Sequence, residues 1–162
     1  MSKTYYQEKF IENVEGFDFN FLSNLLDDTF CSSKTIHTFH SEYLLDATIQ
    51  VKDVHRNERF FQFYDYLNQC FNPSGMKASI DLFVNFTTGG NSTVHKDYES
   101  VKIIGLYGNT FYRFGDQECV LQPGDLLSIE SGVIHKAVGL SPRICMSYGN
   151  WDKEGDLNKY TV

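Results

Sequence analysis

Apolar residues recur at helical intervals in the first part of the chain. This spacing predicts two helices, over Phe19–Phe30 and Glu58–Phe71. The second helix has the clearer apolar stripe, and Pro73 ends it because proline cannot continue an α-helix. We expect this stripe to pack against the protein core. Two short strands are also predicted, at Thr35–Phe39 and Ala47–Val54.

From residue 78 onward, apolar and polar positions alternate with a period of two, which is typical of strands with one buried face. Glycine- or proline-containing turns separate these runs. The pattern predicts a mainly β fold with N-terminal helices, whose eight later strands form a jelly roll, the double-stranded β-helix of cupins. The predicted strands are Ala78–Phe86, Val94–Tyr98, Val101–Tyr107, Thr110–Phe114, Glu118–Leu121, Asp125–Ile129, His135–Leu140 and Arg143–Asn150.

A length of 162 residues is typical of one domain. We expect a single cupin-like domain over residues 1–162, with an N-terminal elaboration (1–74), a jelly-roll core (75–151) and a tail (152–162). The formal net charge is −7 and Lys and Arg form no cluster, so nucleic acid is not expected as a partner.

The location expected from the sequence is the cytoplasm. The longest apolar runs are too short to span a membrane, and the N-terminus lacks the apolar stretch of a signal peptide. The 4 cysteines are widely spaced and form no C-x-x-C pair, so we expect reduced thiols.

The candidate chemistry lies in His95, Asp97 and His135. Residues i and i+2 of a strand point to the same face, so His95 and Asp97 can face one metal ion. His135 begins a later strand that can be a neighbour at one mouth of the barrel. Two imidazoles and one carboxylate are the ligand set of non-haem Fe(II) oxygenases. The alternative is a metal-free jelly roll in which both histidines only form hydrogen bonds.

The residues around this triad resemble the two characteristic motifs of cupins. Asp97 stands where many cupins have a second histidine, and Glu130 replaces the usual proline of the second motif. The matching runs are Gly89-x5-His95-x-Asp97 with Gly108, and Gly124-x5-Glu130-x-Gly132-x2-His135.

A closer resemblance is to the JmjC-like, cupin-fold branch of the 2-oxoglutarate (2OG) oxygenases, and it covers residues 78–151. That branch has H-x-D, a glycine 13 residues after the first histidine, an L-x-P-G-D-x-L-x-I stretch before the distal histidine, and a final Asn-Trp. The corresponding residues here are His95-Lys96-Asp97, Gly108, Leu121–Ile129, His135 and Asn150-Trp151.

The resemblance implies that His95, Asp97 and His135 hold Fe(II) and leave positions open for 2OG and dioxygen. It further implies that oxidative decarboxylation of 2OG to succinate drives hydroxylation of a C–H bond. The prime substrate, a small molecule or a protein side chain, is not indicated by the sequence. A homodimer is suggested only by analogy with other jelly rolls.

A cation is needed for the far carboxylate of 2OG, because burying a carboxylate without a partner is costly. JmjC-like enzymes usually place a lysine two residues after the glycine that corresponds to Gly108, where this chain has Thr110. Other 2OG oxygenases use a basic residue on the last strand, as Arg143 could here. An exposed arginine after a Ser-Pro turn is the alternative. Without 2OG, the same ligands would indicate a metal-dependent cupin dioxygenase or isomerase.

The last predicted strand contains a conflict between two candidate site residues. Asn150 aligns with a family residue that faces the site, but it lies seven residues after Arg143, so a regular strand places the two on opposite faces. Both can face inward only with a bulge, for which Gly149 is the candidate. We favour the face of Arg143. Further candidates near the cosubstrate are Asn85, Tyr107 and Thr110.

Overall fold

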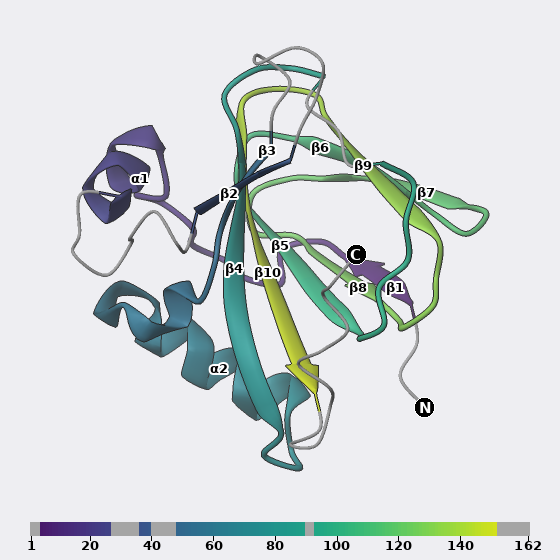
Figure 1. The fold of residues 1–162 in the computed structure, drawn as a ribbon, viewed down its shortest axis with the longest axis horizontal. Helices are drawn as coiled ribbons and strands as arrows, with labels where there is room; N and C mark the ends of the chain where they lie inside the picture. The colour runs from purple at the N-terminus through teal and green to yellow at the C-terminus, as the bar shows by residue number, and fades with distance from the viewer. Residues whose placement is uncertain (1–3, 27–35, 40–47, 90–92, 152–162) are drawn as a thin grey trace.

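Two antiparallel sheets form the framework of the fold (Figure 1). The computed structural model describes residues 4–26, 36–39, 48–89 and 93–151. The larger sheet has the strand order β1-β8-β5-β10-β4-β3-β2, and the smaller sheet has the order β7-β6-β9. The strands are β1 (Tyr5–Gln7), β2 (Ile36–Phe39), β3 (Thr48–Val51), β4 (Lys77–Asn85), β5 (Val101–Tyr107), β6 (Thr110–Phe114), β7 (Gln117–Leu121), β8 (Leu126–Ile129), β9 (His135–Gly139) and β10 (Arg143–Trp151).

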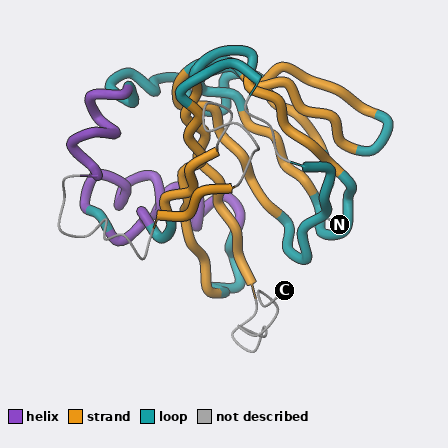
Figure 2. Tube along the Cα trace, turned by 45° about the horizontal axis from the view of Figure 1, so that its top comes forward, coloured by secondary structure: helices purple, strands orange, loops and turns teal. Residues whose placement is uncertain are grey.

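The helices lie on the side of the larger sheet that faces away from the smaller sheet (Figures 1 and 2). They are α1 (Phe19–Leu26) and α2 (Phe61–Phe71), and two single 3₁₀ turns, Val54–Arg56 and Glu58–Phe60, precede α2. The predicted second helix is therefore confirmed from Phe61 onward. The last four residues of the predicted first helix lie outside the described residues. No helix in the described ranges has the length and hydropathy needed to cross a membrane.

The predicted mainly β fold is confirmed, with one strand missing and one added. Seven of the eight predicted core strands form. The predicted strand Val94–Tyr98 is wrong, because only His95 makes a bridge, to His135. Strand β1 was not predicted, since three residues are too few for a periodic signal. Thr35 and Ala47, the first residues of two predicted strands, lie outside the described residues.

Strand β10 separates two apolar cores by its alternating side chains. Ile144, Met146 and Tyr148 belong to the core between the larger sheet and the helices. Cys145 belongs to the second core, between the two sheets, with Tyr112 and other residues of β5, β6, β8 and β9. Side chains on the Cys145 face therefore point into the barrel, and those on the Tyr148 face point toward α2.

The buried carboxylate of Asp125 ties the N-terminal segment to the turn between β7 and β8. It accepts hydrogen bonds from the Tyr6 hydroxyl at 2.6 Å, from the Lys9 backbone N–H at 3.0 Å and from the Gln122 backbone N–H at 2.9 Å. Burial and the hydrogen bond to Asp125 raise the pKa of Tyr6, which keeps its hydroxyl a donor. This carboxylate holds the short strand β1 at the edge of the larger sheet.

Replacing Asp125 with alanine is expected to lower the free energy of unfolding by about 3 kcal/mol, because two backbone N–H groups and one phenol lose a charged acceptor. Urea denaturation measures the change. Asp116→Ala, in the exposed turn between β6 and β7, is the control and should change the unfolding free energy by less than about 0.5 kcal/mol. Equal midpoints for the two variants would show that Asp125 does not anchor the segment.

Candidate metal centre and the buried arginine behind it

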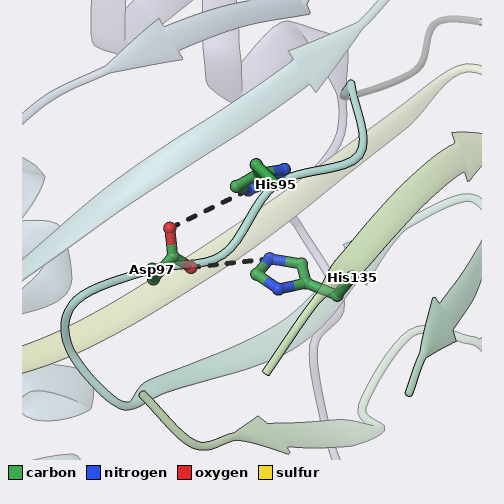
Figure 3. Close-up of side chains that lie close together, drawn as sticks. All are labelled: His95, Asp97 and His135. Carbon is green, nitrogen blue, oxygen red and sulfur yellow. Dashed lines mark ion pairs between the residues drawn. The ribbon is translucent and has the colours of Figure 1, made fainter. Parts of the chain in front are cut away.

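His95, Asp97 and His135 come together at one end of the smaller sheet, and their side chains point toward one another (Figure 3). The Asp97 carboxylate lies 3.8 Å from His95 Nε2 and 3.5 Å from His135 Nε2. One ligand atom from each residue lies within 4.8 Å of the others. Among the described residues, no other group of three His, Cys, Asp or Glu side chains is placed in this way.

Backbone pairing sets this geometry. His95 and His135 lie opposite each other and exchange both hydrogen bonds, at 3.0 and 2.8 Å. Two residues later, the Asp97 carbonyl accepts from the backbone N–H of Gly132, at 2.8 Å. We call Thr93–Tyr98 the rim segment. It places His95 and Asp97 on one face, as expected for a strand, although it forms only a single bridge.

Both imidazoles are oriented by carbonyl groups of their own segments. His95 Nδ1 lies 2.7 Å from the Thr93 carbonyl oxygen, and His135 Nδ1 lies 3.0 Å from the Val133 carbonyl oxygen. Because a carbonyl only accepts, Nδ1 is the donor in both contacts, and in a neutral imidazole Nε2 is then the nitrogen with the lone pair. In both histidines Nε2 is the nitrogen that lies close to Asp97. Backbone carbonyls hold metal-ligating histidines in this way. The donor set therefore fits a divalent transition metal such as Fe(II).

One side of the triad is buried and the other is open. The His135 side chain is 4% exposed, whereas the side chains of His95 and Asp97 are 40% and 34% exposed. Burial and the negative charge of nearby Asp97 raise the pKa of Glu99. A metal ion here would contact the barrel on one side and remain accessible from the other.

Inside the barrel, the buried guanidinium of Arg143 is held by the amide side chain of Asn85, and the hydroxyl of Thr48 holds Asn85 in turn. Arg143 is only 2% exposed and lies opposite Asn85 across the pair of β10 and β4. Its Nε donates to Asn85 Oδ1 at 2.7 Å, and Asn85 Nδ2 donates to Thr48 Oγ1 at 2.8 Å. The alternative considered from the sequence, an exposed Arg143, is therefore wrong.

Along β6, Tyr112 lies between the region of Arg143 and the region of the triad. Along β6, Thr110 lies opposite Gly139, Tyr112 opposite Ala137, and Phe114 opposite His135. The pKa of Tyr112 is raised by burial, while the charge of Arg143 and its hydrogen bond to the phenol act in the opposite direction. The four residue steps from Gly139 to His135 span about 13 Å of strand, with Tyr112 near the middle.

Thr110 also faces the interior of the barrel. It is fully buried, and its Oγ1 lies 3.4 Å from the Sγ of Cys145. The position at which the resemblance leads one to expect a lysine therefore points into the interior of the barrel but carries no charge. Arg143 lies on the same face of β10 as Cys145, so it brings a positive charge close to this position.

Asn150 and Tyr107 do not join these residues, and the expectation that they line the site is corrected. Strand β10 pairs with β4 without interruption from Arg143 to Trp151, so no bulge forms at Gly149. Asn150 therefore faces α2, where its Nδ2 donates to the Phe71 carbonyl at 3.0 Å. Tyr107 also faces the helices.

The position of Tyr107 follows from a bulge in its own strand. Against β10, the pairing shifts between Ile144 and Cys145, so that Tyr107 lies opposite Ile144 while Gly105 lies opposite Cys145. The Tyr107 ring lies 5.3 Å from the ring of Phe19 in α1.

Two residues near Arg143 were not singled out from the sequence. Tyr112 could have been found from the sequence, because it lies two residues after Thr110 on the same strand and must share its face. Thr48 could not have been found from the sequence, because its contact with Asn85 depends on the pairing of β3 with β4. These two strands are separated in the sequence by α2.

The sequence matches no protein-family model and no curated protein. Solved structures with a similar fold include YcfD, a ribosomal oxygenase from Escherichia coli. Its complex with cobalt and succinic acid has a TM-score of 0.75 at 17% identity, and its complex with cobalt and 2-oxoglutarate has a TM-score of 0.74 at 16% identity. Each match covers 94% of this chain and 49% of the other, so the chain spans about half the length of YcfD.

An RmlC-like cupin from Shewanella frigidimarina is also similar, with a TM-score of 0.49 at 15% identity, over 78% of this chain and 94% of that one. At such identities the likeness concerns the fold. The two-sheet jelly roll of this chain is therefore a fold that it shares with the structures of YcfD.

Proposed function

We propose that this chain is an Fe(II)- and 2OG-dependent oxygenase that hydroxylates its substrate. The observation that carries the proposal is the triad of His95, Asp97 and His135, with both Nε2 atoms close to one carboxylate. Iron bound there would supply the activation of dioxygen that is coupled to oxidative decarboxylation of 2OG to succinate. The similarity to YcfD, solved with cobalt and 2-oxoglutarate, supports this assignment.

In this proposal Arg143 binds the far carboxylate of 2OG. A buried guanidinium offers a planar set of donors that matches a carboxylate. The hydrogen bond from its Nε to Asn85 fixes the plane of the group, and Thr48 in turn holds Asn85. In the same proposal the Tyr112 hydroxyl, which accepts a hydrogen bond from Arg143, donates its proton to this carboxylate. Arg143 thus supplies the charge that Thr110 lacks.

The proposal is tested by anaerobic titration of the purified protein with Fe(II) and then with 2OG, followed by measurement of succinate after air is admitted. We expect 2OG to bind only after iron is present, and succinate to form slowly even without a prime substrate. A protein that binds iron but neither binds nor consumes 2OG would contradict the proposal. Iron-supplemented growth is needed, because Ni and Zn compete for such ligands.

A second candidate is a metal-dependent cupin enzyme that does not use 2OG, either a dioxygenase or an isomerase. The observation in its favour is the uncharged Thr110 at the position of the family lysine. Under this alternative, metal binds to the triad, 2OG has no effect, and replacement of Arg143 leaves activity unchanged. Protein that holds no metal after iron-supplemented growth would instead support a metal-free ligand-binding jelly roll.

Tyr112→Phe is expected to weaken 2OG binding by about 3- to 10-fold, because one neutral hydrogen bond to the carboxylate is lost while the ring keeps its packing. Calorimetric titration of the iron-loaded protein under nitrogen measures this change. The control is Tyr98→Phe, since the Tyr98 side chain is 75% exposed, whereas Arg143 is buried. Unchanged affinity in Tyr112→Phe would remove Tyr112 from the cosubstrate site.

A further inference from the structure

Asp97 is the one ligand of the triad that lies outside the bridge between the rim segment and β9. His95 and His135 are fixed to each other by two backbone hydrogen bonds, whereas Asp97 follows this bridge by two residues. Within the described part of the chain, its carboxylate pairs only with the two imidazoles of the triad. The direction of this carboxylate is therefore set through the backbone that carries it.

The carbonyl groups of Asp97 and Tyr98 both accept hydrogen bonds from one turn. The Asp97 carbonyl accepts from the Gly132 backbone N–H at 2.8 Å, and the Tyr98 carbonyl accepts from the Ser131 hydroxyl at 2.6 Å. In a regular strand, the carbonyls of successive residues point in opposite directions. Two bonds to the same turn therefore bend the chain at Tyr98 and fix the two peptide units that follow Asp97.

The same turn also orients His135. We call residues 130–133 the clamp turn, and a backbone hydrogen bond of 3.2 Å between its first and last residues closes it. Its last carbonyl, that of Val133, lies 3.0 Å from His135 Nδ1. On the other side, the Ser131 backbone N–H donates to the Ser100 hydroxyl at 3.2 Å. The clamp turn thus fixes the segment before the distal histidine to the segment after the carboxylate ligand.

From these contacts, and resting on the metal centre of the proposed function, we propose that Ser131 is a positioning residue for Asp97. Its hydroxyl holds the Tyr98 carbonyl, and the carboxylate thereby stays close to both imidazoles before a metal ion binds. A ligand that is already in place loses less conformational freedom when the ion binds, so the affinity is higher. Removing a group that holds a metal ligand in this way typically lowers metal affinity by about 10- to 100-fold.

The Ser131 hydroxyl is the part of this arrangement that a substitution can remove. The bond from Gly132 comes from the backbone and remains in any variant, whereas Ser131→Ala removes only a hydroxyl from an exposed turn. We expect Ser131→Ala to weaken metal binding by about 10-fold, and Ser131→Thr, which keeps a hydroxyl, to stay within about 2-fold of the unsubstituted protein. Calorimetric titration of metal-free protein uses Ni(II) as the probe, because Ni(II) binds such ligands more tightly than Fe(II).

A double-mutant cycle shows whether Ser131 acts through Asp97. In protein that carries Asp97→Ala, the carboxylate is absent and Ser131 has no ligand to position. Adding Ser131→Ala should then change the Ni(II) affinity by less than about 2-fold, instead of about 10-fold. An equal loss of affinity in both backgrounds would mean that Ser131 acts on the rim segment in general, and it would overturn the proposal.

Ser141→Ala is the matched control. This serine lies in the turn at the opposite end of β9, where its hydroxyl donates to the Pro142 carbonyl at 3.0 Å and accepts from the Asn109 backbone N–H at 2.9 Å. Its replacement removes comparable hydrogen bonds and should leave the Ni(II) affinity unchanged. Thermal unfolding of the metal-free variants gives the loss of stability with which each loss of affinity is compared. An equal loss of Ni(II) affinity in Ser131→Ala and Ser141→Ala would contradict the role of Ser131.

The outcomes also separate this inference from the proposed function, because Ni(II) binding needs neither 2OG nor dioxygen. If Ser131→Ala keeps the full Ni(II) affinity while the unsubstituted protein binds iron and consumes 2OG, the inference fails and the proposed function stands. If the cycle gives the expected values but 2OG is not consumed, the inference stands and the proposed function fails. Unsubstituted protein that binds no Ni(II) would overturn both.

Discussion

His95→Ala is expected to weaken Fe(II) binding by at least about 100-fold and to abolish succinate formation. Removing even a side chain that only supports a metal ligand lowers affinity by 10- to 100-fold, and this substitution removes a ligand itself. The His95 side chain is 40% exposed, so the variant should fold with little loss of stability. Anaerobic titration with Fe(II), and metal analysis of protein from iron-supplemented cells, measure the effect.

His55→Ala is the matched control. This histidine lies on the other side of the larger sheet, where its ring stacks at 5.0 Å on Tyr64 and its Nδ1 accepts from the Ile80 backbone N–H. Its loss should reduce stability but leave the affinity for iron unchanged. Retention of iron by His95→Ala, or an equal loss in both variants, would show that the triad is not the metal centre.

Arg143→Gln is expected to raise the Kd for 2OG by about 30-fold or more, while the affinity for Fe(II) is kept. Truncating one partner of a buried, charge-assisted pair typically costs about 2–5 kcal/mol, and 1.4 kcal/mol corresponds to a factor of ten. Glutamine can still bond to Asn85 but presents no positive charge. Arg143→Lys keeps the charge and loses the planar donors, so an intermediate Kd is expected.

Calorimetric titration of the iron-loaded variants with 2OG under nitrogen gives these constants. Arg113→Gln is the control, because Arg113 lies on the outer face of β6, is exposed and pairs with Glu118. Thermal unfolding of the metal-free variants shows whether loss of the buried guanidinium also reduces stability. A 2OG affinity that is unchanged in Arg143→Gln would favour the cupin enzyme that does not use 2OG.

Elements with a long periodic pattern were predictable from the sequence. The apolar stripe that precedes Pro73 forms α2, and the alternating runs after residue 78 form strands close to their predicted bounds. The rim segment shows where such reasoning fails. Its alternation is that of a strand, but after His95 the chain turns toward β5 and keeps only the bridge to His135. Local alternation sets the direction of side chains, whereas a ladder also needs a continuous partner.

The same distinction applies to the surroundings of Arg143. The seven-residue separation of Arg143 and Asn150 placed them on opposite faces, and the pairing of β10 with β4 agrees. Which of these two faces of β10 points into the barrel depends on what covers each side of the sheet. The helices cover the face of Asn150, and the smaller sheet covers the face of Arg143. Tyr107 was misplaced because the bulge in β5 depends on its pairing with β10.

By itself, the sequence determined the residue types of a metal site, the helix and strand content, and the alternation that puts His95 and Asp97 on one face. These features depend on contacts between residues close in the chain. Only the tertiary structure decided that His135 meets them, that Arg143 is buried against Asn85 and Tyr112, and that Asn150 packs on α2. Those contacts join residues 31 to 79 positions apart, and strand order and sheet packing bring them together.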